Sequence, residues 1–151
     1  MKRILSVALI LLLLMMPLTL TACGDEGELQ DGYYTAEASE FHFGWKEYIT
    51  IMVKDGSIVS VEYNAENPSG FIKSWDNAYM QTMLHTNGTY PNEYTRYYAG
   101  QLLENQKADG IDALTGASSS YDSFQKLAAA VLDQAKKGDS STKLVDTGAS
   151  E

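Results

Sequence analysis

The chain has 151 residues, which is enough for a short targeting segment and one domain of ordinary size. Its formal net charge of −9 at pH 7 opposes contact with phosphate backbones, so we expect no nucleic-acid partner. Cys23 is the single cysteine, which excludes an intrachain disulfide and a zinc site built from several cysteines.

The N-terminus has the composition of a secretory signal. Lys2 and Arg3 are basic, residues 4–16 are almost entirely apolar, and small or polar residues follow. The alternative is a membrane-spanning helix, but the apolar run is shorter than the roughly 20 residues that a bilayer requires, and Pro17 interrupts its end. We therefore expect residues 1–22 to be a cleaved signal peptide.

Residues 20–23, Leu-Thr-Ala-Cys, resemble a bacterial lipobox. The resemblance implies cleavage before Cys23 and attachment of a diacylglyceryl group to its sulfur. Two acyl chains give stable anchoring, whereas a single chain holds only marginally. The implied location is the outer face of the cytoplasmic membrane, with residues 23–31 as a lipid-anchored tether.

Alternating and β-branched residues predict three strands. Residues 34–38 alternate in polarity, and residues 48–53 and 58–63 are richer in β-branched and aromatic side chains. Between the last two, Asp55 and Gly56 supply the positive-φ positions of a type I′ turn and predict a β-hairpin. The side chains expected to share inner faces are Ile49, Ile51 and Val53 on one strand, and Val59, Val61 and Tyr63 on the other.

Three helices are predicted after the hairpin. Residues 71–84 and 93–106 each place aromatic residues at helical spacing, and residues 124–135 carry the clearest apolar stripe, which Gly138 ends. Residues 138–151 are rich in small and polar residues and predict a disordered tail. The folded domain is thus expected over residues 32–137, as an α+β fold in which a small antiparallel sheet with a β-hairpin packs against about three helices.

Residues 112–120 are small and hydroxyl-bearing, and they lead into the last helix. One interpretation is an N-cap, in which Ser119 or Ser120 satisfies free amides of the helix start. Capping does not explain why Gly and Ala precede the serines, since small residues let another group approach the backbone. The free amides would also suit a phosphate, and the hydroxyl of Ser118 is placed to form an ester with it.

The same segment resembles the flavinylation motif of the FMN-binding domain family, Asp-x-x-Ser/Thr-Gly-Ala-Thr/Ser-x-Ser/Thr. That family includes the flavin subunits of the Rnf and sodium-pumping NADH:quinone oxidoreductase complexes, and lipoproteins of Gram-positive extracellular electron transfer. The resemblance implies that an FAD:protein FMN transferase attaches FMN to Ser118 through a phosphoester bond. The residues that match the motif are Asp112, Thr115, Gly116, Ala117, Ser118 and Ser120.

Residues 66–70 resemble the Glu-Thr-Pro-Gly loop that lies near the flavin in this family, with departures at two positions. The resemblance implies that Pro68 and Gly70 contact the cofactor, although an ordinary strand-to-helix turn explains the same residues. Trp75 follows this loop and is the aromatic residue that we expect beside the flavin.

The implied function is electron transfer by a membrane-anchored flavoprotein rather than autonomous catalysis, because no hydrolase triad, phosphate loop or metal-ligand pattern occurs in the sequence. The implied electron donor is a membrane quinol-oxidising or NADH dehydrogenase partner, and the acceptor is extracellular. Two alternatives stay open: a lipoprotein that binds FMN or another ligand without a covalent bond, and a precursor whose signal peptide is released as a signalling peptide.

Overall fold

The computed structural model describes residues 27–148, so the predictions for the signal peptide and for Cys23 lie outside the described residues. Within the described range no helix is both long enough and apolar enough to cross a bilayer. The elements of this range, in chain order, are β1 (Gly32–Ala38), β2 (Lys46–Lys54), β3 (Ser57–Glu66), the 3-10 helix η1 (Lys73–Trp75), α2 (Asn77–Asn87), α3 (Pro91–Asn105), α4 (Ser118–Lys137) and β4 (Lys143–Val145).

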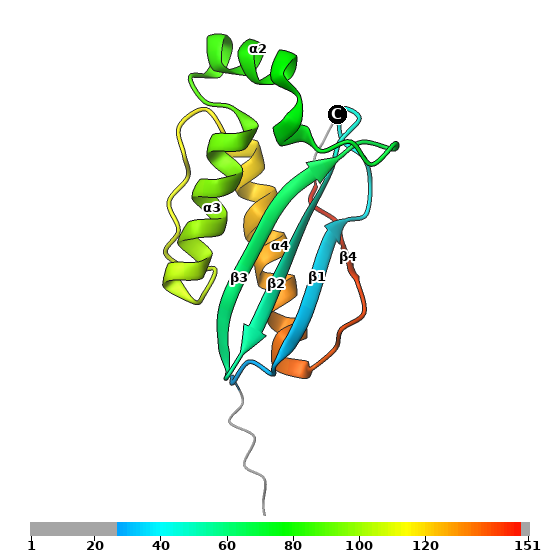
Figure 1. Ribbon diagram of the computed structural model, residues 1–151, viewed down its shortest axis with the longest axis vertical. Helices are drawn as coiled ribbons and strands as arrows, with labels where there is room; N and C mark the ends of the chain where they lie inside the picture. Colours follow the sequence, from blue (N-terminus) through cyan, green and yellow to red (C-terminus); the bar gives the residue numbers. More distant parts are fainter. Residues whose placement is uncertain (1–26, 149–151) are drawn as a thin grey trace, which may run out of the picture.

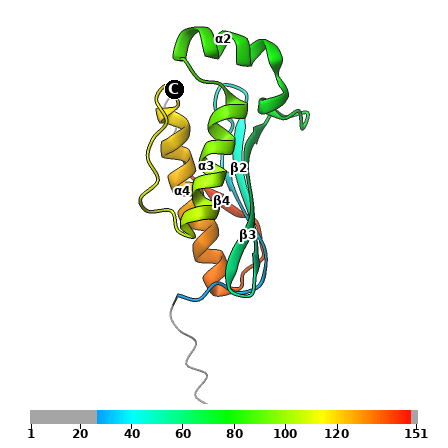
Figure 2. The ribbon, with the colours of Figure 1, turned by 60° about the vertical axis from the view of Figure 1, so that its left-hand side comes forward.

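The strands form one sheet in the order β3-β2-β1-β4. Strands β1, β2 and β3 pair antiparallel, whereas β4 runs parallel to β1. Helices α3 and α4 lie side by side on one face of the sheet, and α2 lies across one end of it (Figures 1 and 2). The predicted α+β class is confirmed, and the sheet is mixed rather than purely antiparallel because of β4.

The predicted hairpin is present, with one correction to its inner face. Asp55 and Gly56 have φ values of 52° and 71°, as a type I′ turn requires. The ladder shifts register beside Met52, so that Val53 pairs with Ile58 and Val59 becomes the extra residue of a β-bulge. Ile58 is therefore buried, and Val59, which the alternation had placed inside, is exposed.

An aromatic cluster fills the core between the sheet and the helices. The rings of Tyr98 and Phe124 stack with centroids 5.1 Å apart, and Tyr63 packs edge-on against Phe124 at 5.1 Å. Helix α4 buries the stripe that the sequence predicts, because its apolar residues recur every three or four positions. The stripe comprises Phe124, Leu127, Ala128, Val131, Leu132 and Ala135.

The helix predicted over residues 71–84 is divided in two. A 3-10 turn at Lys73–Trp75 is followed by Asp76, whose backbone is extended and whose Oδ1 accepts a hydrogen bond from the Tyr79 amide at 3.0 Å. Asp76 is therefore the N-cap of α2, since an aspartate in this position satisfies an amide that the helix itself leaves free.

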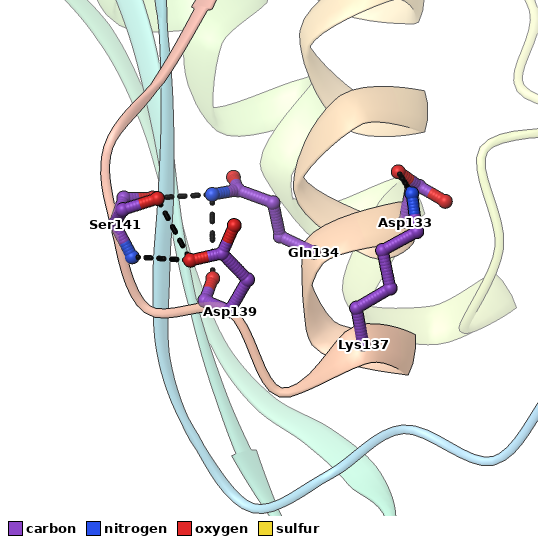
Figure 3. A network of polar contacts seen from close by, with 5 residues as sticks. All are labelled: Asp133, Gln134, Lys137, Asp139 and Ser141. Atoms are coloured by element: carbon purple, nitrogen blue, oxygen red, sulfur yellow. Dashed lines mark hydrogen bonds and ion pairs between the residues drawn. The ribbon is translucent and has the colours of Figure 1, made fainter.

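A network of polar contacts at the end of α4 fixes the course of the segment that follows it (Figure 3). Gly138 adopts the left-handed conformation that ends the helix, with φ 67°. The Gln134 amide then donates hydrogen bonds to the carbonyls of Asp139 and Ser141. The Asp139 carboxylate accepts from the amide and hydroxyl of Ser141, which lowers the pKa of Asp139. The chain therefore turns back, and Lys143–Val145 pairs with β1 where the sequence predicted a disordered tail.

A polar cavity at the start of helix α4

A cavity of about 520 Å³ is lined by residues of α2, of the start of α4 and of the segments between them and the sheet. Residues of the loop between β1 and β2, of β2, η1, α2, α3 and the start of α4 line it. Pockets that hold small-molecule ligands typically have volumes of about 300–1,000 Å³. The cavity is thus large enough for a ligand with several fused rings.

The serine-rich motif forms the first turn of α4. Helix α4 begins at Ser118, its N-cap residue is Ala117, and no side chain of the described residues caps it. The expectation that Ser119 or Ser120 caps this helix is therefore wrong, because both lie within its first turn rather than before it. Ser118 and Ser119 are exposed, whereas Ser120 is buried, and Ser119 and Ser120 line the cavity.

Two tyrosine hydroxyls hold the loop that leads into α4. The Tyr98 hydroxyl accepts a hydrogen bond from the Leu114 amide at 3.0 Å and donates one to the Ala117 carbonyl at 3.3 Å. The Tyr121 hydroxyl donates to the Ile111 carbonyl at 2.9 Å. Since Tyr98 is fully buried, its two hydrogen bonds attach the motif to the hydrophobic core.

Gly116, the glycine of the motif, is required because the end of α2 lies against its backbone. Gly116 has a φ of 85°, and a Cβ atom built on it would lie 2.1 Å from the carbonyl oxygen of Asn87. The Asn87 side-chain amide also donates a hydrogen bond to the Gly116 carbonyl at 3.3 Å. The group that approaches this backbone closely is therefore the end of α2, which seats that helix over the start of α4.

The carboxyl group of the half-buried Glu47 forms part of the cavity wall. Glu47 Oε1 lies 3.0 Å from the hydroxyl oxygen of Tyr63, which also lies 2.9 Å from the carbonyl oxygen of Ser120. Burial raises the pKa of Glu47, although the Ser123 hydroxyl and the positive charge of Lys73 act in the opposite direction. Desolvation dominates here because it disfavours the charged form of the carboxyl group.

A lysine and two aromatic rings form the adjoining wall. Lys73 Nζ lies 5.0 Å from the ring centroid of Tyr79 and 5.8 Å from that of Trp45, within the range of cation–π attraction. The two rings meet edge to face at 6.2 Å. Burial lowers the pKa of Lys73, and Glu47 opposes that shift. Lys73 makes no ion pair within 4.0 Å with the carboxylates of residues 27–148.

The predicted site residues are only partly brought together. Gly116 and Ser120 line the cavity, whereas the predicted acceptor Ser118 is exposed outside the described lining. Ala117 is buried, and Asp112 and Thr115 are exposed on the loop before α4. The motif therefore contributes only part of its length to the cavity wall.

The loop over residues 66–70 is an ordinary turn, in which Asn67 Oδ1 accepts hydrogen bonds from the amides of Ser69 and Phe71. Pro68 and Gly70 are exposed, and Trp75 is 66% exposed and packs against Phe71. None of these three belongs to the described cavity lining.

Sequence reasoning missed Glu47, Lys73 and Trp45. A signal for Glu47 was present, because the alternation that places Ile49 and Ile51 inside also places residue 47 on the inner face of β2. An acidic residue on an inward-facing position is a candidate for function, since an isolated charge is costly to bury. Lys73 lies in the short 3-10 turn η1 and Trp45 in the loop before β2, and neither segment is long enough for periodicity to indicate which way a side chain points.

No family model matches the sequence. The chain is 32% identical over 112 residues to the 15 kDa lipoprotein of Treponema pallidum, a match that covers 74% of this chain and 79% of that protein.

Two solved structures are also similar. The crystal structure of the CPE2226 protein of Clostridium perfringens is 38% identical, with a TM-score of 0.75 over 78% of this chain and 98% of that one. A solution NMR structure of a Clostridium thermocellum protein is 30% identical, with a TM-score of 0.50 over 71% of this chain and 92% of that one.

Proposed function

This chain belongs to the family of the 15 kDa lipoprotein of Treponema pallidum, and on that premise we propose that it is a membrane-anchored flavoprotein that carries covalent FMN on Ser118. In this proposal Cys23 bears the lipid, and the domain relays electrons on the outer face of the cytoplasmic membrane. The observation that carries the proposal is the position of Ser118, which is an exposed hydroxyl in the first turn of α4, directly before two residues of the cavity wall.

The described residues fit an FMN group. A phosphate esterified to Ser118 would meet the free amides and the positive end of the dipole of a 20-residue helix. The flat ring system has a cavity of about 520 Å³ beside it, with the aromatic rings of Trp45 and Tyr79 in its wall. Bound there, the flavin would supply the redox chemistry, and the protein would supply orientation and electrostatic tuning.

The proposal requires partners outside this chain. A transferase that uses FAD would form the phosphoester, since a nucleophile needs an activating base and Ser118 is exposed on the helix start. A membrane quinol-oxidising or NADH dehydrogenase partner would deliver electrons, and an extracellular acceptor would take them. Asp112 and Thr115 are exposed on the loop before α4, where such a transferase could reach them.

The test is flavinylation of the full chain, co-expressed with an FAD:protein FMN transferase. The mass should increase by one FMN moiety after denaturation, and peptide mapping should place the adduct on Ser118. Ser118→Ala should abolish in-gel flavin fluorescence. Ser119→Ala is the matched control, because both serines are exposed on the same turn, and it should retain the fluorescence. An adduct that persists in Ser118→Ala would refute the assignment.

The cavity also favours one alternative, non-covalent binding of FMN or another ligand. In that case wild-type protein would bind flavin without a mass increase, and Ser118→Ala would bind it equally well. Titration of both proteins with FMN, followed by denaturing mass spectrometry, separates the two functions. Lipid attachment is tested independently, because Cys23→Ala should abolish labelling with radioactive palmitate.

A further inference from the structure

The contacts of the Tyr63 hydroxyl indicate whether the Glu47 carboxyl group in the cavity wall carries a proton. The hydroxyl oxygen lies within hydrogen-bonding distance of two oxygens, the Ser120 carbonyl at 2.9 Å and Glu47 Oε1 at 3.0 Å. A hydroxyl has a single proton, and a carbonyl oxygen can only accept. Both contacts are full hydrogen bonds when Tyr63 donates to the Ser120 carbonyl and a protonated Glu47 donates to the Tyr63 oxygen.

Desolvation of Glu47 favours the same state, against the opposing effects of the Ser123 hydroxyl and the positive charge of Lys73. Tyr63 is buried in the aromatic core, and burial raises its pKa well above the usual value, so the hydroxyl keeps its proton and can donate it to the Ser120 carbonyl. Burial also raises the pKa of Glu47 itself. A neutral carboxyl group that donates a hydrogen bond costs far less to bury than a carboxylate.

Five elements contribute a polar or titratable group near Glu47. These groups are Tyr63 of β3, Lys73 of η1, Tyr79 of α2, Tyr94 of α3, and Ser120 and Ser123 of α4. Lys73 is the one cation among them, and burial lowers its pKa. Glu47 and Lys73 therefore face the same cavity, and burial favours the neutral form of each.

We propose that Glu47 is protonated in the folded protein at neutral pH and is the residue that exchanges a proton with a redox ligand in the cavity. The first half of the proposal rests on the contacts of Tyr63 alone. The second half rests on the proposed function, which supplies a flavin as the ligand and a quinol as the reductant.

The exchange balances in atoms and electrons. Oxidation of a quinol to a quinone releases two electrons and two protons, and full reduction of a flavin takes up two of each. Glu47 gives its proton to the ring as the electrons arrive, and the resulting carboxylate takes up one of the two protons that the quinol released. The other quinol proton reaches the flavin through solvent, and Glu47 ends the cycle protonated.

Protonation is tested without flavin, by NMR of the full chain purified in detergent with ¹³C-labelled glutamate. The Glu47 carboxyl resonance, identified by its loss in Glu47→Gln, should report a protonated group at pH 7 and titrate above the other glutamates. In Glu62→Gln, which changes an exposed carboxylate on β3, the Glu47 resonance and its titration should be unchanged. A Glu47 resonance of a carboxylate at pH 7 would overturn the first half.

Proton exchange is tested in flavin-loaded protein, by the midpoint potential as a function of pH. Wild-type protein and Glu62→Gln should show a change of slope at the pH where Glu47 titrates, and Glu47→Gln should lose it. A slope change that persists in Glu47→Gln would overturn the second half. If no FMN attaches to Ser118, the proposed function fails and the exchange fails with it, whereas the NMR titration still decides protonation.

Discussion

Helices α4 and α2 meet at the cavity, but they are held in opposite ways. Helix α4 buries nine of its residues, most of them against the sheet, whereas in the described part of the chain α2 buries none. The position of α4 is therefore set by the hydrophobic core, and that of α2 by its Asp76 cap and by the close contact of Asn87 with Gly116. The partly buried side chain of Met83 also helps to set the position of α2. The cavity thus has one rigid wall and one weakly held wall, and elements with few buried contacts are the first to open.

The largest expected effect follows from removing a core side chain of α4. Phe124→Ala should lower the free energy of unfolding by about 3–5 kcal/mol, because it deletes a ring that stacks on Tyr98 and contacts Tyr63. Leu84→Ala in α2 should change it by less than about 0.5 kcal/mol, since Leu84 is exposed. Urea unfolding of the two variants is the measurement, and equal losses would contradict the contrast between the helices.

The next effect concerns the contact between the two helices. Gly116→Ala should lower the free energy of unfolding by more than the ~1–2 kcal/mol cost of a side chain in a left-handed conformation, because the new methyl group would displace Asn87. Gly110→Ala is the matched control, with a similar φ of 82° and no described atom within 4 Å of the added methyl.

Hydrogen exchange measures the same contact locally. The amides of α2 should exchange faster in Gly116→Ala and stay unchanged in Gly110→Ala, because only the first variant displaces the helix. If both variants loosen α2 alike, the Asn87 contact does not seat the helix.

A smaller effect is expected from the pH dependence of stability. The pKa of Glu47 is raised in the folded state, so the folded protein binds more protons than the unfolded chain between the two pKa values. The contribution of Glu47 to stability should therefore be greatest below the unfolded value near 4.5 and be lost as the pH rises through the raised value. Glu47→Gln should remove this decrease, because its amide can still donate to Tyr63, and it should be more stable than wild type at pH 8. Denaturation from pH 4 to 9 checks the sign.

The smallest effect on stability is expected at the proposed acceptor. Ser118→Ala and Ser119→Ala should each change the free energy of unfolding by less than about 0.5 kcal/mol, since both side chains are exposed and neither caps α4. Urea denaturation is the measurement. A loss of about 1 kcal/mol or more at either position would contradict the exposed, non-capping positions of these two side chains.

Much of the fold could be predicted because its signals are local. The stripe of α4, the Asp55–Gly56 turn and the strand segments each follow from side-chain periodicity or from the backbone preference of one or two residues. The bulge at Val59 and the break at Asp76 could not be predicted in this way, because each depends on a pairing or a cap that competes with an unbroken pattern.

The sequence alone determined the motif at residues 112–120, the inward position of residue 47 and the apolar face of α4, because these depend on the order of residues along one segment. Only the tertiary structure decided that Glu47 and Lys73 face one cavity with Ser120. It also decided that Gly116 serves the packing of α2 and that Lys143–Val145 joins the sheet. These features join segments far apart in the chain, and such contacts form only when burial of a common core brings the segments together.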